Sequence, residues 1–207
     1  MELVIATSNL HKVLELKAMI RSLFKDVDFF SLRDFPDYTP PEEKGSSFSE
    51  IAELKATHAA KALNKYAIAD DSGLIVPALN GEPGLHSRRY AGASATDKEN
   101  RDKLINKLKG LKEDDCFAFF ECALSLASPE KVVKTIRGVC EGHLLTEPRG
   151  RSGFGYDPLF LKHDYNKTFA ELEEDIKNRI SHRRKAFDKL VPYLEAELLK
   201  LETPSSN

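Results

Sequence analysis

The chain has 207 residues, of which 33 are acidic and 31 are basic, so its formal net charge is −2 at neutral pH. A protein that coats nucleic acid needs a basic excess and an acidic disordered tail needs the opposite, so this balance excludes both classes. Hydrophobic residues make up 41% of the chain and charged residues 31%, as in an ordinary globular protein. The length favours one domain, which we expect over residues 1–202, followed by a disordered tail at 203–207.

The cysteines and the apolar runs indicate the compartment. Cys116, Cys122 and Cys140 are an odd number at spacings that fit no zinc or redox motif, so we expect reduced, buried thiols. No apolar run approaches the roughly 18 residues that a membrane span needs, and the chain does not begin like a signal peptide. We therefore expect a cytoplasmic protein with no membrane partner.

The first quarter of the chain predicts alternating strands and helices. An apolar run over residues 2–6 is typical of a buried strand, and cap-forming residues then precede a helix over 13–24 with apolar residues at helical spacing. A second strand is expected over 29–32. A loop rich in Pro and Gly then leads to a helix over 48–65.

The middle of the chain predicts a short strand at 68–69 that ends at the sequence Asp70-Asp71-Ser72-Gly73. There we expect a turn that projects the acidic side chains from a sheet edge. Residues 77–95 are rich in Gly and Pro and predict a long surface loop, and Asp97 opens a helix that stops at Gly110.

The last third of the chain predicts an antiparallel hairpin and two helices. The hairpin pairs residues 117–127 with 131–139. The sequence Thr168-Phe169-Ala170-Glu171 has capping-box spacing for a helix to about residue 180, and Ser181 begins the last helix, whose apolar stripe extends to Leu201. Strands and helices interleave, so the fold class is α/β with a mixed sheet.

Two features of the first half could meet an anion. The turn from Thr7 to Lys12 lies between a strand and a helix start, where free backbone N–H groups favour an anion. It lacks the glycines of a Walker A loop, and taken alone it is better explained as an ordinary capped helix start. Lys55 fills a gap in the apolar stripe of its helix, so its ammonium must reach solvent or meet an anion.

Two acidic pairs could bind a metal ion. Asp70 and Asp71 are adjacent, and Glu42 and Glu43 lie in the loop before Gly45. Neighbouring carboxylates repel each other, and a divalent cation relieves that repulsion. Mg²⁺ needs only one or two carboxylates besides phosphates and waters, so one acid from each pair would suffice. Each pair by itself is also explained as solvated turn residues.

Two later motifs could bind a nucleotide base. The sequence Gly153-Phe154-Gly155-Tyr156-Asp157-Pro158 leaves the ring faces of Phe154 uncrowded, so a base could stack there while Asp157 accepts a base N–H. The alternative is that Phe154 fills a core at a tight turn. The basic run from His182 to Lys185 opposes the dipole at a helix start, which suggests ligand binding; a nucleic-acid patch is the weaker alternative.

Together, seven motifs in order resemble the inosine triphosphate pyrophosphatase family. The resemblance implies an α/β fold in which a long mixed sheet with flanking helices forms two lobes around a central active-site cleft, and a homodimer. It implies Mg²⁺-dependent hydrolysis of non-standard purine nucleoside triphosphates such as ITP, dITP and XTP to the monophosphate and pyrophosphate. The matching segments are Thr7 to Lys12, Glu43 to Gly45, Lys55-Ala56, Ala69 to Leu74, Pro83 to Gly92, Gly153 to Pro158 and Ser181 to Arg183.

The resemblance also implies roles for individual residues. Asp71 would orient or deprotonate the attacking water and bind Mg²⁺ with Glu43, while Lys55 would neutralise phosphate charge. Lys177 or Arg183 would donate to O6 of a 6-keto purine, which would select against adenine. The triphosphate end of the substrate would be contacted by Thr7, Ser8, Asn9, Lys12 and Ser72. The base pocket would comprise Phe154, Gly155, Tyr156, Asp157, Lys177, His182 and Arg183.

Three positions depart from the family's pattern, namely Ile51, Cys116 and Ile176. None has a chemical role here, so we expect them to affect packing or dimer contacts. Two alternative functions stay open at this point. One is a related pyrophosphatase for modified pyrimidine nucleotides, and the other is a nucleotide- or RNA-binding module that does not hydrolyse its ligand.

Overall fold

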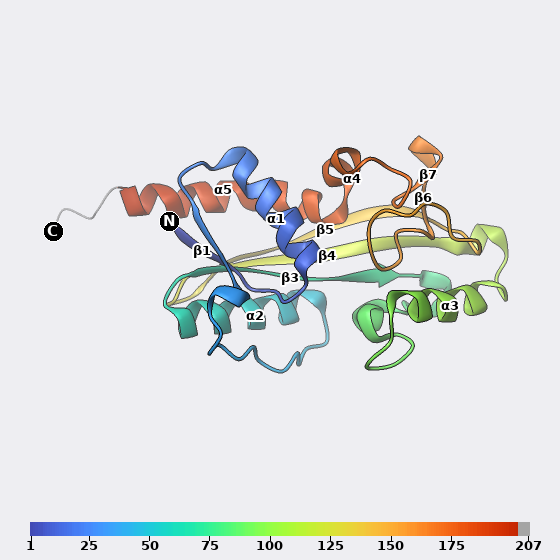
Figure 1. Cartoon of the computed structure of the whole chain (residues 1–207), viewed down its shortest axis with the longest axis horizontal. Helices are drawn as coiled ribbons and strands as arrows, with labels where there is room; N and C mark the ends of the chain where they lie inside the picture. The colour runs from blue at the N-terminus through green and yellow to red at the C-terminus, as the bar shows by residue number, and fades with distance from the viewer. Residues whose placement is uncertain (203–207) are drawn as a thin grey trace. The chain divides into compact units, whose positions relative to one another are not determined.

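The structure is a computed structural model that describes residues 1–202, so the tail predicted at 203–207 lies outside the described residues. Seven strands form a sheet in the order β2-β1-β3-β4-β5-β6-β7 (Figure 1). β1 pairs in parallel with β2 and β3, whereas β6 pairs antiparallel with β5 and β7, so the predicted mixed sheet is confirmed. The strands are β1 (Glu2–Ile5), β2 (Asp28–Ser31), β3 (Tyr66–Ile75), β4 (Phe117–Ala127), β5 (Val132–Leu144), β6 (Phe160–Lys162) and β7 (Lys167–Thr168).

The second, third and fifth helices begin within one residue of their predicted starts, and the first helix begins three residues before its predicted start. Asn9 caps the first helix with its side chain, and Thr96 and Glu99 form a reciprocal capping box at the start of the third. Both caps are legible in the sequence because they depend on residues only two or three positions apart. The helices are α1 (Leu10–Leu23), α2 (Phe48–Leu63), α3 (Asp97–Leu108), α4 (Glu174–Ile180) and α5 (His182–Glu202).

The chain divides into two compact units. The first comprises Met1–Asp71, Cys122–Gly138 and the chain from Arg183, and the second comprises Ser72–Glu121 and Val139–His182. Strands β3, β4 and β5 each contribute residues to both units.

In the first unit, helices cover both faces of the sheet. Ile68 of β3 packs in one cluster with apolar residues of α1 and α5, whereas Ala67 and Ala69 of the same strand pack with alanines of α2. Figure 1 shows α1 and α5 on one side of these strands and α2 on the other. This arrangement follows from the alternation of side chains along a strand, which sends successive residues to opposite faces.

The second unit has its own core. Leu104 and Leu108 of α3 pack with Phe120 of β4 and with Phe160 and Phe169 from the C-terminal part of the unit. All five side chains are at most 8% exposed. α3 is therefore anchored by its apolar face, and its opposite face is available for polar contacts.

The predicted end of a strand at Asp70 is wrong. β3 continues through Asp70-Asp71-Ser72-Gly73 to Ile75. It lies between β1 and β4 in the sheet; β1 pairs with it as far as Ile68, and β4 is its hydrogen-bonded neighbour on the other side. That pairing outweighs the local preference of Ser72-Gly73 for a turn. The two aspartates therefore lie inside a strand and not at a sheet edge.

The helix predicted from Thr168 is also wrong at its start, because Thr168 ends β7 and α4 begins at Glu174. Glu171 does accept the Thr168 backbone N–H at 2.8 Å, which is half of a capping box. The Thr168 hydroxyl, however, donates to the Arg149 carbonyl at 2.8 Å and leaves no cap for a following helix. In α5, Leu201 is 52% exposed, so the buried stripe ends before that residue.

Other expectations agree with the structure. β4 and β5 are neighbours in the sheet, joined by a short turn in which the Ser128 N–H donates to the Lys131 carbonyl at 2.9 Å, which confirms the hairpin. Cys116, Cys122 and Cys140 are buried thiols, and none of the three forms a disulfide within residues 1–202. Within residues 1–202, no helix is both long and apolar enough to cross a membrane.

We predict that Glu171 stabilises the fold in a pH-dependent way. Hydrogen bonds from Arg149 and from the Thr168 N–H lower the pKa of Glu171 to about 2, from an ordinary value of 4.5. A group with a lowered folded pKa stabilises the fold above its unfolded pKa and loses that effect as the pH falls. Glu171→Gln should therefore lower the melting temperature at pH 7 by about 2–4 °C. The difference should shrink between about pH 4.5 and pH 2.

Thermal unfolding by circular dichroism at several pH values measures this effect. Glu147→Gln is the matched control, because Glu147 is an exposed glutamate of the same unit. A wild-type minus Glu171→Gln difference that is equal at pH 7 and at pH 2.5 would contradict the prediction.

Candidate active site

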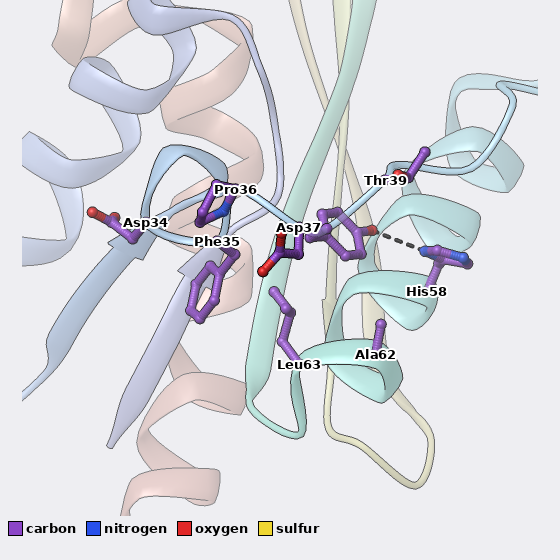
Figure 2. A pocket seen from close by; sticks show the side chains of 9 residues that line it. Asp34, Phe35, Pro36, Asp37, Thr39, His58, Ala62 and Leu63 are labelled. Carbon is purple, nitrogen blue, oxygen red and sulfur yellow. Dashed lines mark hydrogen bonds between the residues drawn. The ribbon is translucent and has the colours of Figure 1, made fainter.

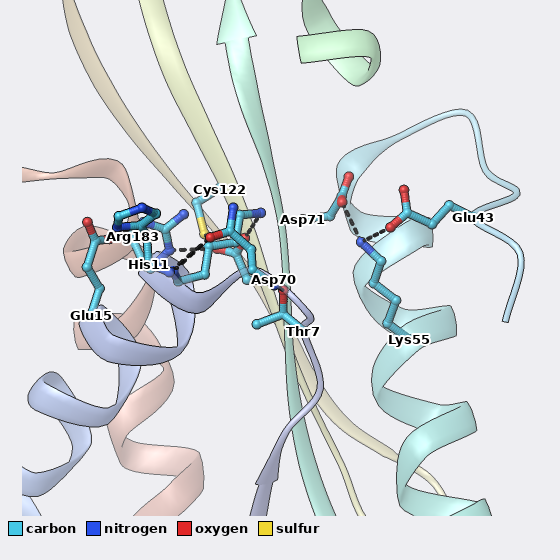
Figure 3. A network of polar contacts seen from close by, with 11 residues as sticks. Thr7, His11, Glu15, Glu43, Lys55, Asp70, Asp71, Cys122 and Arg183 are labelled. Carbon is cyan, nitrogen blue, oxygen red and sulfur yellow. Dashed lines mark hydrogen bonds and ion pairs between the residues drawn. The ribbon is translucent and has the colours of Figure 1, made fainter. Parts of the chain in front are cut away.

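The two adjacent aspartates of β3 serve opposite faces of the sheet. Asp70 lies on the face of Ile68, toward α1 and α5, and Asp71 lies on the face of Ala69, toward α2. Figure 3 shows the two carboxylates on either side of the strand, each in its own group of polar side chains. The expected repulsion between them is therefore relieved by separation, and each carboxylate has a different set of partners.

Asp70 is the centre of a buried ionic network. Its side chain is fully buried, and one of its oxygens accepts from Arg183 Nε and from the Cys122 thiol, each at 2.8 Å. Its other oxygen pairs with Lys12, and Arg183 pairs in addition with Glu15 of α1. Two carboxylates thus face two cations, which offsets much of the cost of removing these charges from water.

This network decides the protonation states of its members. Burial by itself would raise the pKa of Asp70, but the charges of Arg183 and Lys12 hold it well below its usual range. Burial and the neighbouring Asp70 carboxylate raise the pKa of the Cys122 thiol well above its usual value. Cys122 therefore stays protonated and acts as a hydrogen-bond donor to an ionised Asp70.

Asp71 belongs to a smaller and more exposed group. The Lys55 ammonium lies 2.8 Å from Asp71 Oδ1 and 2.7 Å from Glu43 Oε1. The Lys55 and Asp71 side chains are 15% and 14% exposed, whereas Glu43 is 42% exposed. The lysine in the apolar stripe of α2 is thus explained, because its ammonium pairs with two carboxylates.

Burial and charge pairing together set the pKa values of this group. Burial raises the pKa of Asp71, and the positive charges of Lys55 and Lys12 offset the rise only in part. Burial would lower the pKa of Lys55, but Asp71 and Glu43 raise it above its ordinary value. The group therefore combines a fixed cation with a carboxylate that holds a proton more readily than an ordinary aspartate.

Glu43 is positioned by the loop that precedes α2. A Cβ on Gly45 would lie 2.8 Å from Cγ1 of Ile51, so only glycine allows the loop to pass this close to the helix. Ser47 caps α2, and the Ser46 N–H donates to the Glu50 carboxylate at 2.8 Å. Ile51, a departure from the family's pattern, thus forms part of the surface on which this loop packs.

Glu43 and Asp71 could hold a divalent cation together with a substrate. Both carboxylates reach the same point, since each is within hydrogen-bond distance of Lys55 Nζ. In residues 1–202, no three or more His, Cys, Asp or Glu side chains gather as a metal site. Two carboxylates suit Mg²⁺ when phosphates and waters supply the remaining ligands.

The turn before α1 is held by its own side chains. The side-chain oxygen Oδ1 of Asn9 accepts the backbone N–H groups of His11 at 3.0 Å and Lys12 at 3.4 Å, and Thr7 Oγ1 accepts the Asn9 N–H at 3.2 Å. Asn9 therefore occupies backbone donors that the sequence suggested for an anion. Ser8 is exposed beside it, and Ser72 is half-buried on β3 after Asp71.

In the second unit, Asp157 organises the loop around Phe154. Its Oδ2 accepts the Phe154 N–H at 3.0 Å and the buried Lys177 ammonium at 2.7 Å. Lys177 Nζ also lies 4.8 Å from the centre of the Phe154 ring. Gly153 has φ +78°, and a Cβ there would lie 2.2 Å from Asp157 Oδ2. Gly153 is thus required for the approach of this carboxylate.

Two other predicted base-pocket residues are packed into the second unit. His182 is 7% exposed, and its ring stacks on Phe120 at a centroid distance of 4.9 Å. Tyr156 is 4% exposed, and its hydroxyl donates to the Ser87 carbonyl at 2.8 Å. Both side chains therefore have packing partners inside the second unit, Phe120 for His182 and the Ser87 carbonyl for Tyr156.

The predicted site residues fall into two groups, one in each unit. Arg183 is the unexpected member, because it lies with Lys12 and Asp70 in the first unit and not in the unit of Phe154. Glu15 was not predicted, although a glutamate next to the buried positions Leu16 and Met19 of α1 was a usable signal. The first unit holds Thr7, Ser8, Asn9, Lys12, Glu43, Lys55, Asp71 and Arg183, and the second holds Ser72, Phe154, Gly155, Tyr156, Asp157, Lys177 and His182.

A separate pocket of about 560 Å³ lies between α2 and the loop at residues 34–39. The Tyr38 hydroxyl lies 2.9 Å from His58 Nδ1 in this pocket, and Figure 2 shows His58 on α2 with this contact as a dashed line. None of the predicted site residues lines this pocket.

The chain is similar to known proteins over nearly its whole length. Residues 3–193 match the model of the Ham1 family. The chain is 54% identical to a dITP/XTP pyrophosphatase of Protochlamydia amoebophila (strain UWE25), over 94% of this chain and 98% of that protein. It is 50% identical to a dITP/XTP pyrophosphatase of Chlamydia abortus (strain DSM 27085 / S26/3), over the full length of both. The solved structure of the Staphylococcus aureus Ham1 protein is similar with a TM-score of 0.84 and 43% identity, over 95% of this chain and 100% of that one.

We predict that the two adjacent aspartates differ sharply in their effect on stability. Asp70→Asn leaves Arg183 and Lys12 buried without the carboxylate they share, so it should lower the free energy of unfolding by about 3–5 kcal/mol. Asp71→Asn should change it by no more than about 1 kcal/mol, because burial already disfavours the Asp71 charge and Lys55 keeps Glu43. Urea unfolding of both variants measures the difference, and equal losses would contradict the prediction.

Proposed function

The chain belongs to the Ham1 family, and we propose that it hydrolyses dITP, XTP and ITP to the monophosphate and pyrophosphate. The observation that carries this proposal is the Lys55 ammonium held between the carboxylates of Glu43 and Asp71. A fixed cation beside two convergent carboxylates suits a polyanionic substrate that arrives with Mg²⁺.

The reaction is an in-line displacement at the α-phosphorus. Asp71 orients the attacking water and accepts its proton, for which the raised pKa of its carboxylate is suited. The new bond joins the water oxygen to the α-phosphorus, and the bond to the bridging oxygen breaks, so pyrophosphate leaves. Lys55 and Lys12 neutralise phosphate charge. Mg²⁺ held by Glu43 and Asp71 would supply charge neutralisation and polarise the phosphoryl oxygens.

Base recognition is the task of the loop in the second unit. Phe154 stacks on the purine, and the Lys177 ammonium beside its ring donates to O6. Arg183, the other candidate donor, pairs with Asp70 and Glu15 in the first unit, which favours Lys177. Adenine presents an amino group at this position and would place a donor against a donor.

Pyrophosphate release from a panel of triphosphates in the presence of Mg²⁺ tests the proposal. We expect turnover of dITP, XTP and ITP well above that of the common nucleotides. Preference for 5-methyl-UTP would favour a pyrimidine enzyme, and binding without hydrolysis that falls steeply with salt would favour a binding module.

The homodimer and the cytoplasmic location stay predictions. Sedimentation would measure the oligomeric state, and cell fractionation would measure the location.

We predict that the acids of the first unit divide into essential and dispensable ones. Asp71→Asn should retain nucleotide binding and lose about 100- to 10,000-fold in turnover number, because the variant lacks the group that accepts the proton. Glu43→Gln should raise the Mg²⁺ concentration needed for half-maximal rate. Glu42→Gln is the matched control, because Glu42 is an exposed acid of the same loop whose carboxylate pairs with the exposed Lys44 at 2.9 Å. Retained turnover in Asp71→Asn would refute the assignment.

We predict that Phe154→Ala weakens nucleotide binding by about 1–3 kcal/mol, since one base stack is lost. The KM for dITP should rise accordingly, while the turnover number changes little. Phe154→Tyr retains an aromatic ring and should restore most of the affinity. An unchanged KM in Phe154→Ala would show that the ring serves only to fill the core at this turn.

A further inference from the structure

Helix α3 holds the two peptide groups on either side of Gly155, the residue that follows Phe154. The Gly155 N–H donates to Asp97 Oδ2 at 2.7 Å, and the Gly155 carbonyl accepts from Arg101 Nη1 at 2.7 Å. Asp97 and Arg101 are four residues apart, so they lie one above the other on the same face of α3. One turn of helix therefore supplies both a charged acceptor and a charged donor to a single residue of the loop.

Gly155 is the residue of this loop that most needs such support. It has φ +60°, and a Cβ there would meet no atom within 4 Å, so packing does not restrict its backbone. Glycine also has more backbone freedom to lose than any other residue. On its N-terminal side the Phe154 N–H is held by Asp157, and on its C-terminal side the Tyr156 hydroxyl is held by Ser87. Asp97 and Arg101 restrain the flexible point between these two.

Helix α3 is a firm support for the contact. Its start is closed by the Thr96–Glu99 capping box. Asn100 ties it to the preceding loop, since its side chain accepts the Ala91 N–H at 2.8 Å and donates to the Arg88 carbonyl at 3.0 Å. Leu104 and Leu108 anchor its far end in the core of the second unit. The position of Asp97 and Arg101 is thus determined without the loop.

We propose that Asp97 and Arg101 are positioning residues that hold Gly155, and through it the Phe154 ring, in the conformation that stacks on the purine. This inference rests on the proposed function. The bond to Asp97 is exposed and the bond to Arg101 is partly buried, so we expect them to add little to the stability of the fold. Their effect is to order the loop before the nucleotide arrives, which lowers the conformational entropy lost on binding.

Steady-state kinetics with dITP test the proposal. Asp97→Ala and Arg101→Ala should each raise KM about three- to tenfold and change the turnover number less than about twofold. Asp97→Asn keeps an acceptor and Arg101→Lys keeps a donor, so both should restore much of the affinity. Lys98→Ala and Asp102→Ala are the matched controls, because they remove the same charges from α3 but contact each other at 2.7 Å.

A double-mutant cycle with Phe154→Ala separates positioning from a general effect on the fold. If Asp97 and Arg101 act through the ring, removing either one in the Phe154→Ala protein should raise KM no further. An equal rise in both backgrounds would overturn the proposal. So would KM values in Asp97→Ala and Arg101→Ala that match those of the two control variants.

Hydrogen exchange gives a readout that needs no activity. The Gly155 amide should exchange faster in Asp97→Ala than in wild type, while amides in the body of α3 keep their protection.

If the wild-type protein releases no pyrophosphate from any triphosphate, the proposed function fails. If the wild type is active but Asp97→Ala and Arg101→Ala behave like the controls, only the positioning role fails.

Discussion

The alternation of side chains along β3 is the constraint on which the first unit depends. Because β3 is an inner strand that continues through Asp70 and Asp71, these neighbours must lie on opposite faces of the sheet. One carboxylate meets α1 and α5, and the other meets α2. A single dipeptide therefore supplies acidic groups to two separate sets of cations.

The two sets differ in burial and therefore in their access to solvent. Asp70 is fully enclosed and neutralised by Arg183 and Lys12, so its charge is permanent and its network joins α1 and α5 to the sheet. Asp71 is partly exposed and shares Lys55 with Glu43, a residue of the loop before α2 whose side chain is 42% exposed. Lys12 reaches toward both carboxylates, since its charge also lowers the pKa of Asp71. The buried network thus fixes Lys12, whose charge acts on Asp71 as well as on Asp70.

The second unit uses backbone contacts for a different purpose. Phe154 lies in a loop whose successive peptide groups are held by the carboxylates of Asp157 and Asp97. Gly153 admits the first of these carboxylates because it has no Cβ, and Gly155 takes a positive φ that most residues avoid. Polar side chains that hold the loop from several directions are consistent with a ring that must be presented to a ligand.

The sequence by itself determined the features that depend on neighbours a few positions apart. These include the caps at Asn9 and Thr96, the boundaries of most helices, and the lysine at position 55 that interrupts an apolar stripe. Tertiary structure decided the rest. Sheet pairing carried β3 through a Ser-Gly sequence, the Arg149 carbonyl took the hydroxyl of Thr168, and Arg183 was buried against Asp70, 113 residues away. Spacing along the chain records local geometry, whereas these outcomes depend on partners that only folding brings together.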